Sequence, residues 1–276
     1  TLSGVPSAAV THLVVRVTPA VWQSGRCDGG ARLRSTRRAP SPADTGDLTM
    51  TDTLATYHKD HWVEIEPERF DRYDRMFRLD PRFAAKLLAP VGVQEGETVL
   101  DFGCGPGYVA VELARVVGAA GAVHAVDVNA EFIERARQVA AEAGGGERIA
   151  HHHAVDETLP LPDASVDRIY CKNVLEYVPD LAHTLSELVR VLRPGGTIVA
   201  SDSDFGFVVV EPLSAAEVAE LFAAAAPAFK EPNVGRKLRN AYRHAGLTDV
   251  KVDIQVAPDP KGNLRGVLEN MLGYGT

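Results

Sequence analysis

The sequence predicts an α/β fold: a doubly wound, mostly parallel sheet preceded by a helical N-terminal lid. Three observations carry this prediction. They are a strand–glycine loop–helix stretch at 99–117, alternation of strand and helix patterns from residue 97 onward, and polar residues directly after successive strands. Parallel strands bring their carboxyl ends to one edge of a sheet, so we expect the functional site at that edge.

Composition limits the classes of protein that fit. The chain has 276 residues, 45% of them hydrophobic and 24% charged, which is typical of a globular protein. Its three widely spaced cysteines favour reduced thiols and a cytoplasmic location over a disulfide framework. The net charge of −8 argues against a nucleic-acid partner, and no apolar run approaches the ~20 residues of a membrane span. We expect a small-molecule partner, no nucleic acid and no membrane, and the sequence leaves room for a homodimer.

Residues 1–49 differ in composition from the rest of the chain. They contain six arginines, no lysine and three acidic residues, a charge of +3, whereas residues 50–276 carry −11. Met50 is the first methionine. We interpret residues 1–49 as a disordered or upstream-translated extension with the true start at Met50. The alternative is an arginine-rich targeting peptide.

Residues 50–96 are expected to form a helical N-terminal cap rich in aromatic residues. Helices are predicted at 69–79 and 82–88, and most of the aromatic side chains are expected to pack on the core. His58 and Tyr73 are weak candidates for contact with a ligand, because this segment directly precedes the strand of the glycine loop.

Residues 97–276 are expected to form the ligand-binding domain. Strands are predicted at 97–102, 123–127, 149–155, 166–171, 197–201 and 249–256. Helices are predicted at 107–117, 131–143, 181–192, 215–226, 234–245 and 263–272. No clear seventh strand follows the sixth.

The glycine loop and the ends of three strands supply the candidate site. Glycines at 103, 105 and 107 allow a sharp turn and the close approach of a ligand. A dinucleotide-binding fingerprint would place its third glycine at Tyr108. Asp127 ends the second strand, 24 residues after Gly103, where a carboxylate can accept both ribose hydroxyls. Asp156 and Asn173 follow the third and fourth strands.

Four segments carry a family resemblance. They are VLDFGCGPG at 99–107, AVDVN at 125–129, VDETLPLPDASVDRIYCKNVLEYVPD at 155–180 and LRPGGTIVASD at 192–202. In this order and spacing they resemble the class I S-adenosylmethionine-dependent methyltransferases, in particular the ubiquinone/menaquinone methyltransferase-like branch that acts on small molecules. The resemblance implies a Rossmann-like fold and S-adenosylmethionine as cofactor.

The resemblance also implies roles for individual residues. The methionine and ribose part of the cofactor would be held by Asp101 and by the loop residues Gly103, Cys104, Gly105 and Gly107. Burial of the Cys104 thiol as a packing residue is the simpler interpretation. The remaining cofactor contacts would come from Asp127 at the ribose, Val128 on the adenine, Asp156 with Glu157 at the adenine edge, and Asn173 with Leu175 near the transferable methyl group.

Residues that could contact the methyl acceptor are less defined. Tyr177 stands where the resembling family often has an aromatic residue or a histidine, so a histidine base is absent there. Asp202 and Asp204 follow the fifth strand, and Asp204 is a weak candidate for a base. Arg236 could bind an acidic substrate, although a surface role at a helix start is the simpler interpretation.

No metal site is expected. The three histidines at 151–153 lie in a predicted strand, where successive side chains point to opposite faces and cannot converge on one ion.

The resemblance implies methyl transfer from S-adenosylmethionine to the oxygen, nitrogen or carbon atom of a small molecule. The alanine-, glycine- and arginine-rich composition suggests a bacterial source and a role in secondary or cofactor metabolism. Two alternatives stay open. One is a protein that binds the cofactor without methylating. The other is an NAD(P)-dependent oxidoreductase, against which the missing third glycine argues.

Overall fold

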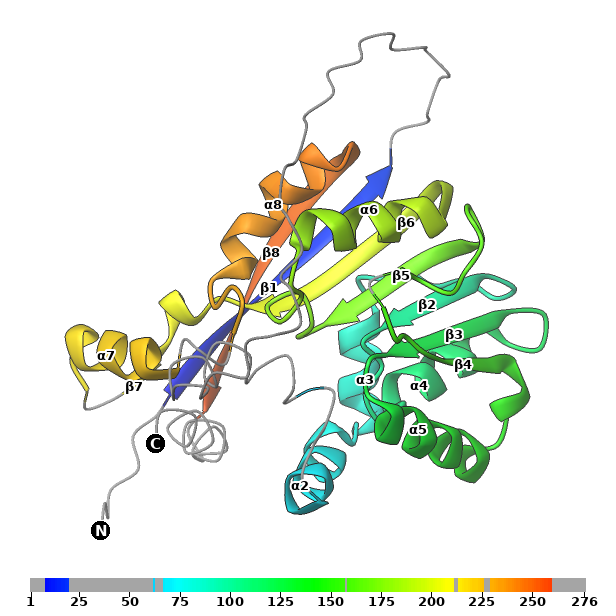
Figure 1. Cartoon of the computed structure of the whole chain (residues 1–276), viewed down its shortest axis with the longest axis horizontal. Coiled ribbons are helices and arrows are strands. Elements are labelled where there is room, and N and C mark those ends of the chain that lie inside the picture. The colour runs from blue at the N-terminus through cyan, green and yellow to red at the C-terminus, as the bar shows by residue number, and fades with distance from the viewer. Residues whose placement is uncertain are drawn as a thin grey trace, which may run out of the picture.

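A computed structural model describes residues 8–19, 62, 67–156, 158–210, 213–225 and 229–259, which form one eight-stranded sheet with flanking helices (Figure 1). The strands are β1 (Ala8–Pro19), β2 (Thr98–Phe102), β3 (Ala122–Asp127), β4 (Ile149–His153), β5 (Val166–Lys172), β6 (Leu192–Ser203), β7 (Val209–Val210) and β8 (Leu247–Asp259). The helices are α2 (Pro67–Phe77), α3 (Pro81–Leu88), α4 (Tyr108–Val117), α5 (Ala130–Ala143), α6 (Leu181–Val191), α7 (Ala215–Ala225) and α8 (Val234–His244), with short 3-10 turns at Gly146–Arg148 and Phe205–Phe207.

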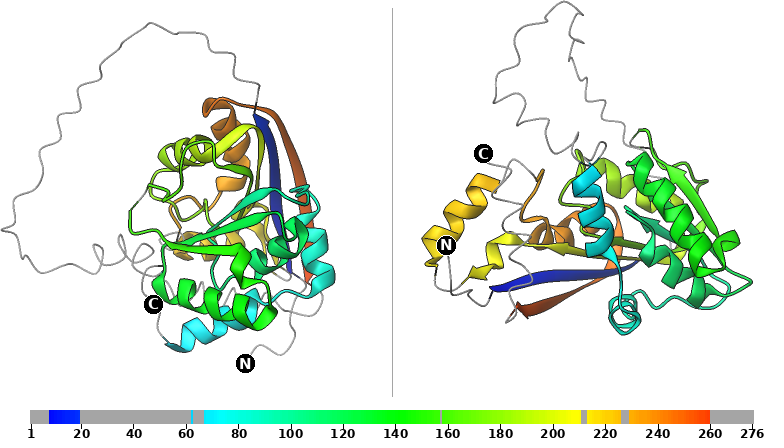
Figure 2. Two further views of the ribbon diagram at one scale, coloured as in Figure 1. Left: turned by 90° about the vertical axis from the view of Figure 1, so that its right-hand side faces the viewer. Right: turned by 90° about the horizontal axis from the view of Figure 1, so that it is seen from below.

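The order of the strands places the glycine loop near the middle of the parallel part of the sheet. Strands β4, β3, β2, β5 and β6 lie side by side in this order, and each pairs in parallel with its neighbour. Strand β1 pairs antiparallel with β6 on one side and with β8 on the other, and β1 and β8 run together in both views of Figure 2. The predicted doubly wound, mostly parallel sheet is confirmed.

Helices cover both faces of the parallel strands because side chains alternate along each strand. Val99 of β2 packs with α3, α4 and α5, whereas Leu100, the next residue, packs with α6 and α8. Both are fully buried. Strands covered on both faces are rich in apolar residues, as the pairs Val99–Leu100 of β2 and Ile169–Tyr170 of β5 illustrate.

The helix boundaries follow capping signals. Asp80 and Asp180 cap α3 and α6 by accepting hydrogen bonds from the first backbone N–H groups of each helix. Gly144, with a φ of 71°, ends α5. The helix boundaries lie within two residues of the predicted ones, and the largest difference is at α2, which starts at Pro67 where 69 was predicted.

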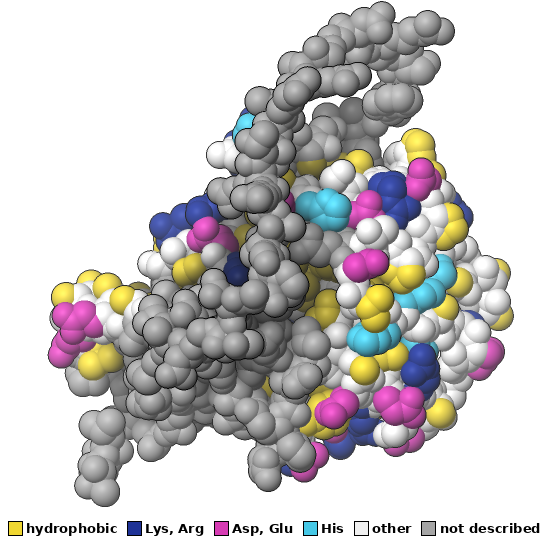
Figure 3. Space-filling view, viewed as in Figure 1, with side chains coloured by type: hydrophobic (Ala, Val, Ile, Leu, Met, Phe, Trp, Pro, Cys, Tyr) yellow, Lys and Arg dark blue, Asp and Glu magenta, His cyan; other side chains and the backbone are white. Residues whose placement is uncertain are grey.

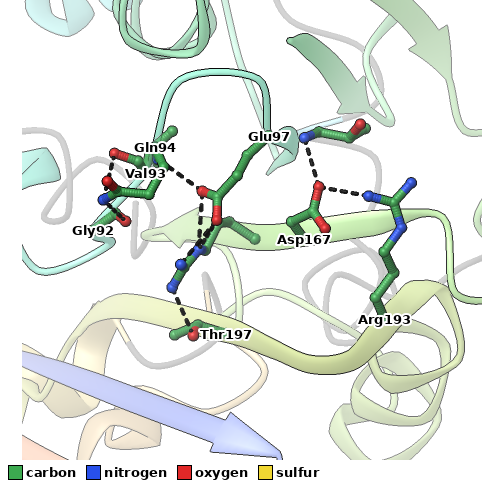
Figure 4. A network of polar contacts seen from close by, with 9 residues as sticks. Gly92, Val93, Gln94, Glu97, Asp167, Arg193 and Thr197 are labelled. Carbon is green, nitrogen blue, oxygen red and sulfur yellow. Dashed lines mark hydrogen bonds and ion pairs between the residues drawn. The ribbon is translucent and has the colours of Figure 1, made fainter.

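A polar network ties the amino ends of β2, β5 and β6 together, at the opposite end of these strands from the glycine loop (Figure 4). Arg168 donates to Glu97 at 2.9–3.1 Å and to Thr197 Oγ1 at 3.0 Å. Asp167 accepts from the Thr98 backbone at 2.8 Å and from Arg193 at 2.6 Å. Burial raises the pKa of Asp167, but these donors outweigh it and lower the pKa below its usual value.

The structure differs from the sequence prediction over the first segment. Residues 8–19 form β1, although residues 1–49 were interpreted as a disordered or upstream-translated extension. Backbone hydrogen bonding to β6 and β8 supplies order that composition does not reveal. Residues 1–7 and 20–49 lie outside the described residues, and so does the predicted helix at 263–272.

The fifth predicted strand is also longer than expected. β6 starts at Leu192 where the predicted strand starts at 197, so Pro194, Gly195 and Gly196 lie inside the strand as an irregularity, and Gly195 has a φ of 83°. Within the described residues, we find no helix that is both long and apolar enough to cross a membrane.

Candidate cofactor-binding site

The glycine loop connects β2 to α4 through three residues with left-handed backbone. Gly103, Gly105 and Gly107 have φ values of 73°, 51° and 83°. A Cβ at Gly103 would lie 2.2 Å from Val174 Cγ2, and one at Gly107 would lie 2.9 Å from the Ala136 Cα. The glycine loop therefore requires glycine both for its conformation and for its contacts with α5 and with residues 173–180, the loop after β5 that we call the β5 loop.

Asp127, at the end of β3, holds the turn of the loop. Its carboxylate accepts from the Gly105 N–H at 2.7 Å and from the Asn129 N–H at 2.9 Å. Asn129 in turn caps α5 through the Phe132 N–H and donates to the backbone carbonyl of Trp62 at 3.0 Å. Asp127 is thus next to both the loop and the N-terminal segment. Its pKa is raised by burial, against the effect of these N–H donors.

Asp101, at the end of β2, is a buried acid without a cationic partner in the described part of the chain. It is 3% exposed, and its Oδ2 has no hydrogen-bond partner there. Burial and the neighbouring Asp127 raise its pKa to about 7. Two buried acids side by side favour a ligand that carries positive charge. The sulfonium and ammonium groups and the ribose hydroxyls of S-adenosylmethionine fit this pair of acidic acceptors.

Asn173 lies where β5 ends, opposite the glycine loop. It adopts a left-handed backbone with a φ of 52°, which is uncommon for a residue other than glycine. Its side chain is held from both ends, since its amide donates to Ser203 Oγ at 2.9 Å and its carbonyl accepts from Lys172 Nζ at 2.9 Å. The family resemblance implies that Asn173, together with Leu175, lies near the transferable methyl group.

Two further buried acids lie behind Asn173. Asp202 is fully buried and accepts from the Val174 N–H at 3.1 Å, so it shapes the β5 loop and is not exposed to a methyl acceptor. Burial raises its pKa to about 7. Glu176 is 1% exposed, and burial together with Asp202 raises its pKa to about 8, although Asn173, Tyr177 and Lys172 oppose this.

A row of aromatic rings extends from α2 past the carboxyl end of β5. The members of this aromatic row, in order, are Phe77, Tyr73, Trp62, Tyr177, Phe229, Phe205 and Phe222, with centroids of successive rings 5.7, 5.2, 5.0, 5.3, 4.6 and 5.3 Å apart. The row brings Tyr73 and Tyr177, both predicted from the sequence, into one contiguous cluster through Trp62. Tyr73 is 3% exposed, which matches the predicted core packing.

Asp204 and Arg236 form an ion pair with each other. Asp204 is fully buried and accepts from Arg236 Nε and Nη2 at 2.6 Å each, and also from the Arg236 and Gly206 backbone. The guanidinium lies 5.0 Å from the centre of the Phe207 ring. The carboxylate proposed as a base and the arginine proposed as a substrate ligand therefore satisfy one another.

The other residues predicted at the cofactor have different surroundings. Cys104 is buried, and burial raises the pKa of its thiol well above the usual value, as suits a packing residue. Leu175 is 1% exposed and belongs to the core beneath the β5 loop. Val128 is exposed beside Asp127, and the exposed Asp156 accepts from the Thr158 N–H. Glu157 and His58 lie outside the described residues.

The three successive histidines of β4 have three different surroundings. His152 contacts His124 of β3, with Nε2 and Nδ1 3.0 Å apart, while His153 Nε2 lies 3.1 Å from the Val128 carbonyl. His151 lies on the other side of the strand, near Arg137 and Ala136 of α5. Histidine side chains reach the surface on the face shown in Figure 3. The histidines at 151–153 therefore do not converge on one point.

Sequence reasoning missed several residues of this site. Asn129 had a recognisable signal, because it follows the strand-ending Asp127 and begins a helix. Glu176 and Lys172 lie in a segment that carries the resemblance, but only the fold shows that they are buried together. Trp62 and Asp74 had no signal in the pattern, since their roles depend on contacts far along the chain.

The fold and the site define a class of protein: a Rossmann-like α/β domain with a glycine loop that binds a nucleotide-type ligand at the carboxyl edge of its sheet. Residues 100–200 match a family model described as a methyltransferase domain. This match and the relatives below support a class I S-adenosylmethionine-dependent methyltransferase domain. S-adenosylmethionine is the cofactor of this family.

Two of the three relatives described here are named as methyltransferases, and each of the three matches only part of this chain. The chain is 37% identical over 164 residues to the ubiquinone/menaquinone biosynthesis C-methyltransferase UbiE of Hahella chejuensis, covering 56% of this chain and 65% of that protein. It is 31% identical over 121 residues to the 27-O-demethylrifamycin SV methyltransferase of Amycolatopsis mediterranei, covering 44% of each. An uncharacterized 37.1 kDa transposon protein of Streptomyces fradiae is 33% identical, and 42% of it is covered.

A solved structure shows the same fold. A SAM-dependent methyltransferase from Aquifex aeolicus matches with a TM-score of 0.51 at 24% identity, covering 66% of this chain and 89% of that one. The chain spans less than two thirds of the length of the three curated relatives named above.

Proposed function

We propose that this chain transfers a methyl group from S-adenosylmethionine to a small-molecule acceptor. The observation that carries the proposal is the pair of buried carboxylates, Asp101 and Asp127, at the glycine loop. They offer negative charge to the cofactor's cationic groups and acceptors to its ribose hydroxyls. The relatives that methylate a rifamycin or act in quinone biosynthesis support a small-molecule acceptor.

The chain's own residues would mainly bind and align. The bound cofactor supplies an activated methyl group, so proximity and orientation give much of the rate. Asp101 and the loop N–H groups would hold the methionine end, Asp127 the ribose, and Val128 would pack on the adenine. Asn173, fixed by Lys172 and Ser203, would face the methyl group. Tyr177, between the rings of Trp62 and Phe229, would line the acceptor side.

Asp202, Asp204 and Arg236 contribute differently from what their sequence positions indicate. Asp202 and Asp204 are both fully buried, and Asp204 is also paired with Arg236, so neither carboxylate is open to an acceptor. We therefore propose no protein base for the reaction.

A labelled cofactor tests the proposal. The full chain would be incubated with S-adenosylmethionine carrying a trideuterated methyl group and a bacterial metabolite extract, and products would be followed by mass spectrometry. We expect at least one metabolite to gain the labelled methyl group while S-adenosylhomocysteine accumulates. Bound cofactor without any labelled product, across extracts of different origin, would favour the alternative of a cofactor-binding protein that does not methylate.

A further inference from the structure

Asp74 of α2 forms a buried polar network that the proposed reaction does not use. Its Oδ1 accepts from Tyr108 Oη at 2.9 Å and from Arg135 Nε at 3.0 Å, and its Oδ2 accepts from Arg78 at 3.1 Å. Arg135 also donates to Tyr108 Oη at 3.4 Å. Asp74 is 8% exposed, so these donors replace the water that the carboxylate loses on burial.

The network joins three elements around the glycine loop. Asp74 comes from α2, Arg135 from α5, and Tyr108 is the first residue of α4, directly after Gly107. A single carboxylate therefore links α2 to the two helices that border the loop. Burial opposes its charge, but the three donors outweigh burial and keep the pKa of Asp74 below its usual value.

The aromatic side of α2 covers the loop itself. Phe77 Cδ2 lies 3.7 Å from the position that a Cβ on Gly105 would take. Phe77 stacks with Tyr73, and Tyr73 stacks with Trp62. The backbone carbonyl of Trp62 accepts from Asn129, two residues after Asp127. Figure 1 and the left view of Figure 2 show α2 beside α5, on the side of the molecule where these contacts form.

These contacts have a consequence for a ligand bound at the glycine loop and Asp127. From the cover of Phe77 over Gly105 and the place of Trp62 next to Asp127, we infer that the ligand leaves when α2 and Trp62 move away. Moving α2 away from α4 and α5 breaks the bonds of Asp74 to Tyr108 and Arg135. Release then includes a conformational step whose barrier depends on these bonds.

We propose that Asp74 is a positioning residue that seats α2 on the glycine loop through Tyr108 and Arg135, and thereby slows release of the bound cofactor. The inference rests on the proposed cofactor, and it concerns the lifetime of the complex and not the transfer of the methyl group. Asp74 contacts the loop only through other residues, so we assign it no catalytic role.

The test measures release directly and needs no acceptor. The full chain is loaded with radiolabelled S-adenosylhomocysteine, chased with excess unlabelled ligand, and sampled by filter binding. We expect Asp74→Asn to release the ligand at least about fivefold faster, with association changed by less than about twofold, because such contacts act mainly on dissociation. Tyr108→Phe should accelerate release less, since it removes no charge and leaves the ion pair of Asp74 with Arg135 in place.

Three controls separate positioning from general destabilisation. Asp71→Asn makes the same chemical change at an exposed position of α2 and should leave release unchanged. Arg168→Ala weakens the network at the far end of the sheet and should lower stability without changing release. The double variant Asp74→Asn/Tyr108→Phe should release ligand no faster than the product of the two single effects, and less if the pair acts as a unit.

The outcomes are distinct. If Asp74→Asn does not fold, Tyr108→Phe alone carries the test, with release at least about twofold faster than in the unaltered chain. Release rates of both variants within error of the unaltered chain would overturn the proposal. Failure of the unaltered chain to bind either S-adenosylmethionine or S-adenosylhomocysteine would instead overturn the proposed function.

Discussion

At the scale of single residues, Asp127 is the side chain on which the cofactor assignment depends most. It already accepts from two backbone N–H groups, so its carboxylate is fixed in place. We predict that Asp127→Ala weakens S-adenosylmethionine binding by about 1–3 kcal/mol, the cost of leaving ribose hydroxyls without partners. Titration calorimetry measures this, with the exposed Glu134→Ala as control. An unchanged dissociation constant would contradict the ribose assignment.

The buried carboxyl group of Asp101 should make the affinity for S-adenosylmethionine depend on pH. Its pKa of about 7 in the free protein means that it is mostly protonated at pH 6 and mostly ionised at pH 7.5. A cationic ligand binds the ionised form, so affinity for S-adenosylmethionine should rise between these values, by at most about tenfold per pH unit. The comparison of affinities stops at pH 7.5 because α-amino groups, such as that of the cofactor, lose their proton near pH 8.

The control for this prediction is Asp101→Asn, which should bind more weakly and show a flat profile over the same range. S-adenosylhomocysteine lacks the sulfonium charge and should show a smaller slope than S-adenosylmethionine. A profile that falls with pH, or one that Asp101→Asn leaves unchanged, would show that Asp101 does not face the cationic groups of the cofactor.

At the scale of elements, the two ends of the parallel strands have separate tasks. The carboxyl ends carry the candidate site, and the amino ends carry the network of Arg168, Glu97 and Thr197. We predict that Arg168→Ala lowers the free energy of unfolding by about 1.5–3 kcal/mol, since it removes charge-assisted hydrogen bonds that are mostly buried. The affinity for S-adenosylhomocysteine should not change.

Chemical denaturation with and without ligand checks this separation. Arg137→Ala, which removes an exposed ion pair with Glu134, is the comparison and should cost at most about 0.5 kcal/mol. A loss of ligand affinity in Arg168→Ala as large as its loss of stability would show that the two ends of the strands are coupled.

Elements that rest on local signals were predictable from the sequence. The strand β2, the glycine loop and the caps of α5 and α6 follow from apolar runs, glycine spacing and side chains that favour helix starts. The same holds for Asp101, Asp127 and Asn173, because the first two lie at the carboxyl ends of strands and the third directly follows one. Trp62, Asp74 and the pairing of Asp204 with Arg236 depend on residues far apart in the chain, and no local pattern predicts them.

At the scale of the whole molecule, the N-terminal segment gives the sharpest contrast between sequence and structure. Composition set residues 1–49 apart, whereas the structure pairs residues 8–19 with both β6 and β8. If that pairing contributes to stability, a chain that begins at Met50 should unfold more easily, by about 3 kcal/mol or more at a net 0.5–1.5 kcal/mol per hydrogen bond.

Comparing denaturant midpoints of residues 1–276 and 50–276 checks this expectation. A shorter chain that is clearly less stable would make β1 part of the folded domain. Equal midpoints would contradict the pairing and support the interpretation that residues 1–49 are an upstream-translated extension.

The account as a whole depends on which nucleotide-type ligand the glycine loop binds. Calorimetric titration of the full chain with S-adenosylmethionine, S-adenosylhomocysteine and NAD in parallel measures this most directly. We predict saturable binding of the first two at one site per chain, lost together in Asp127→Ala, and no heat with NAD. Tight binding of NAD, with no response to S-adenosylmethionine, would contradict the account.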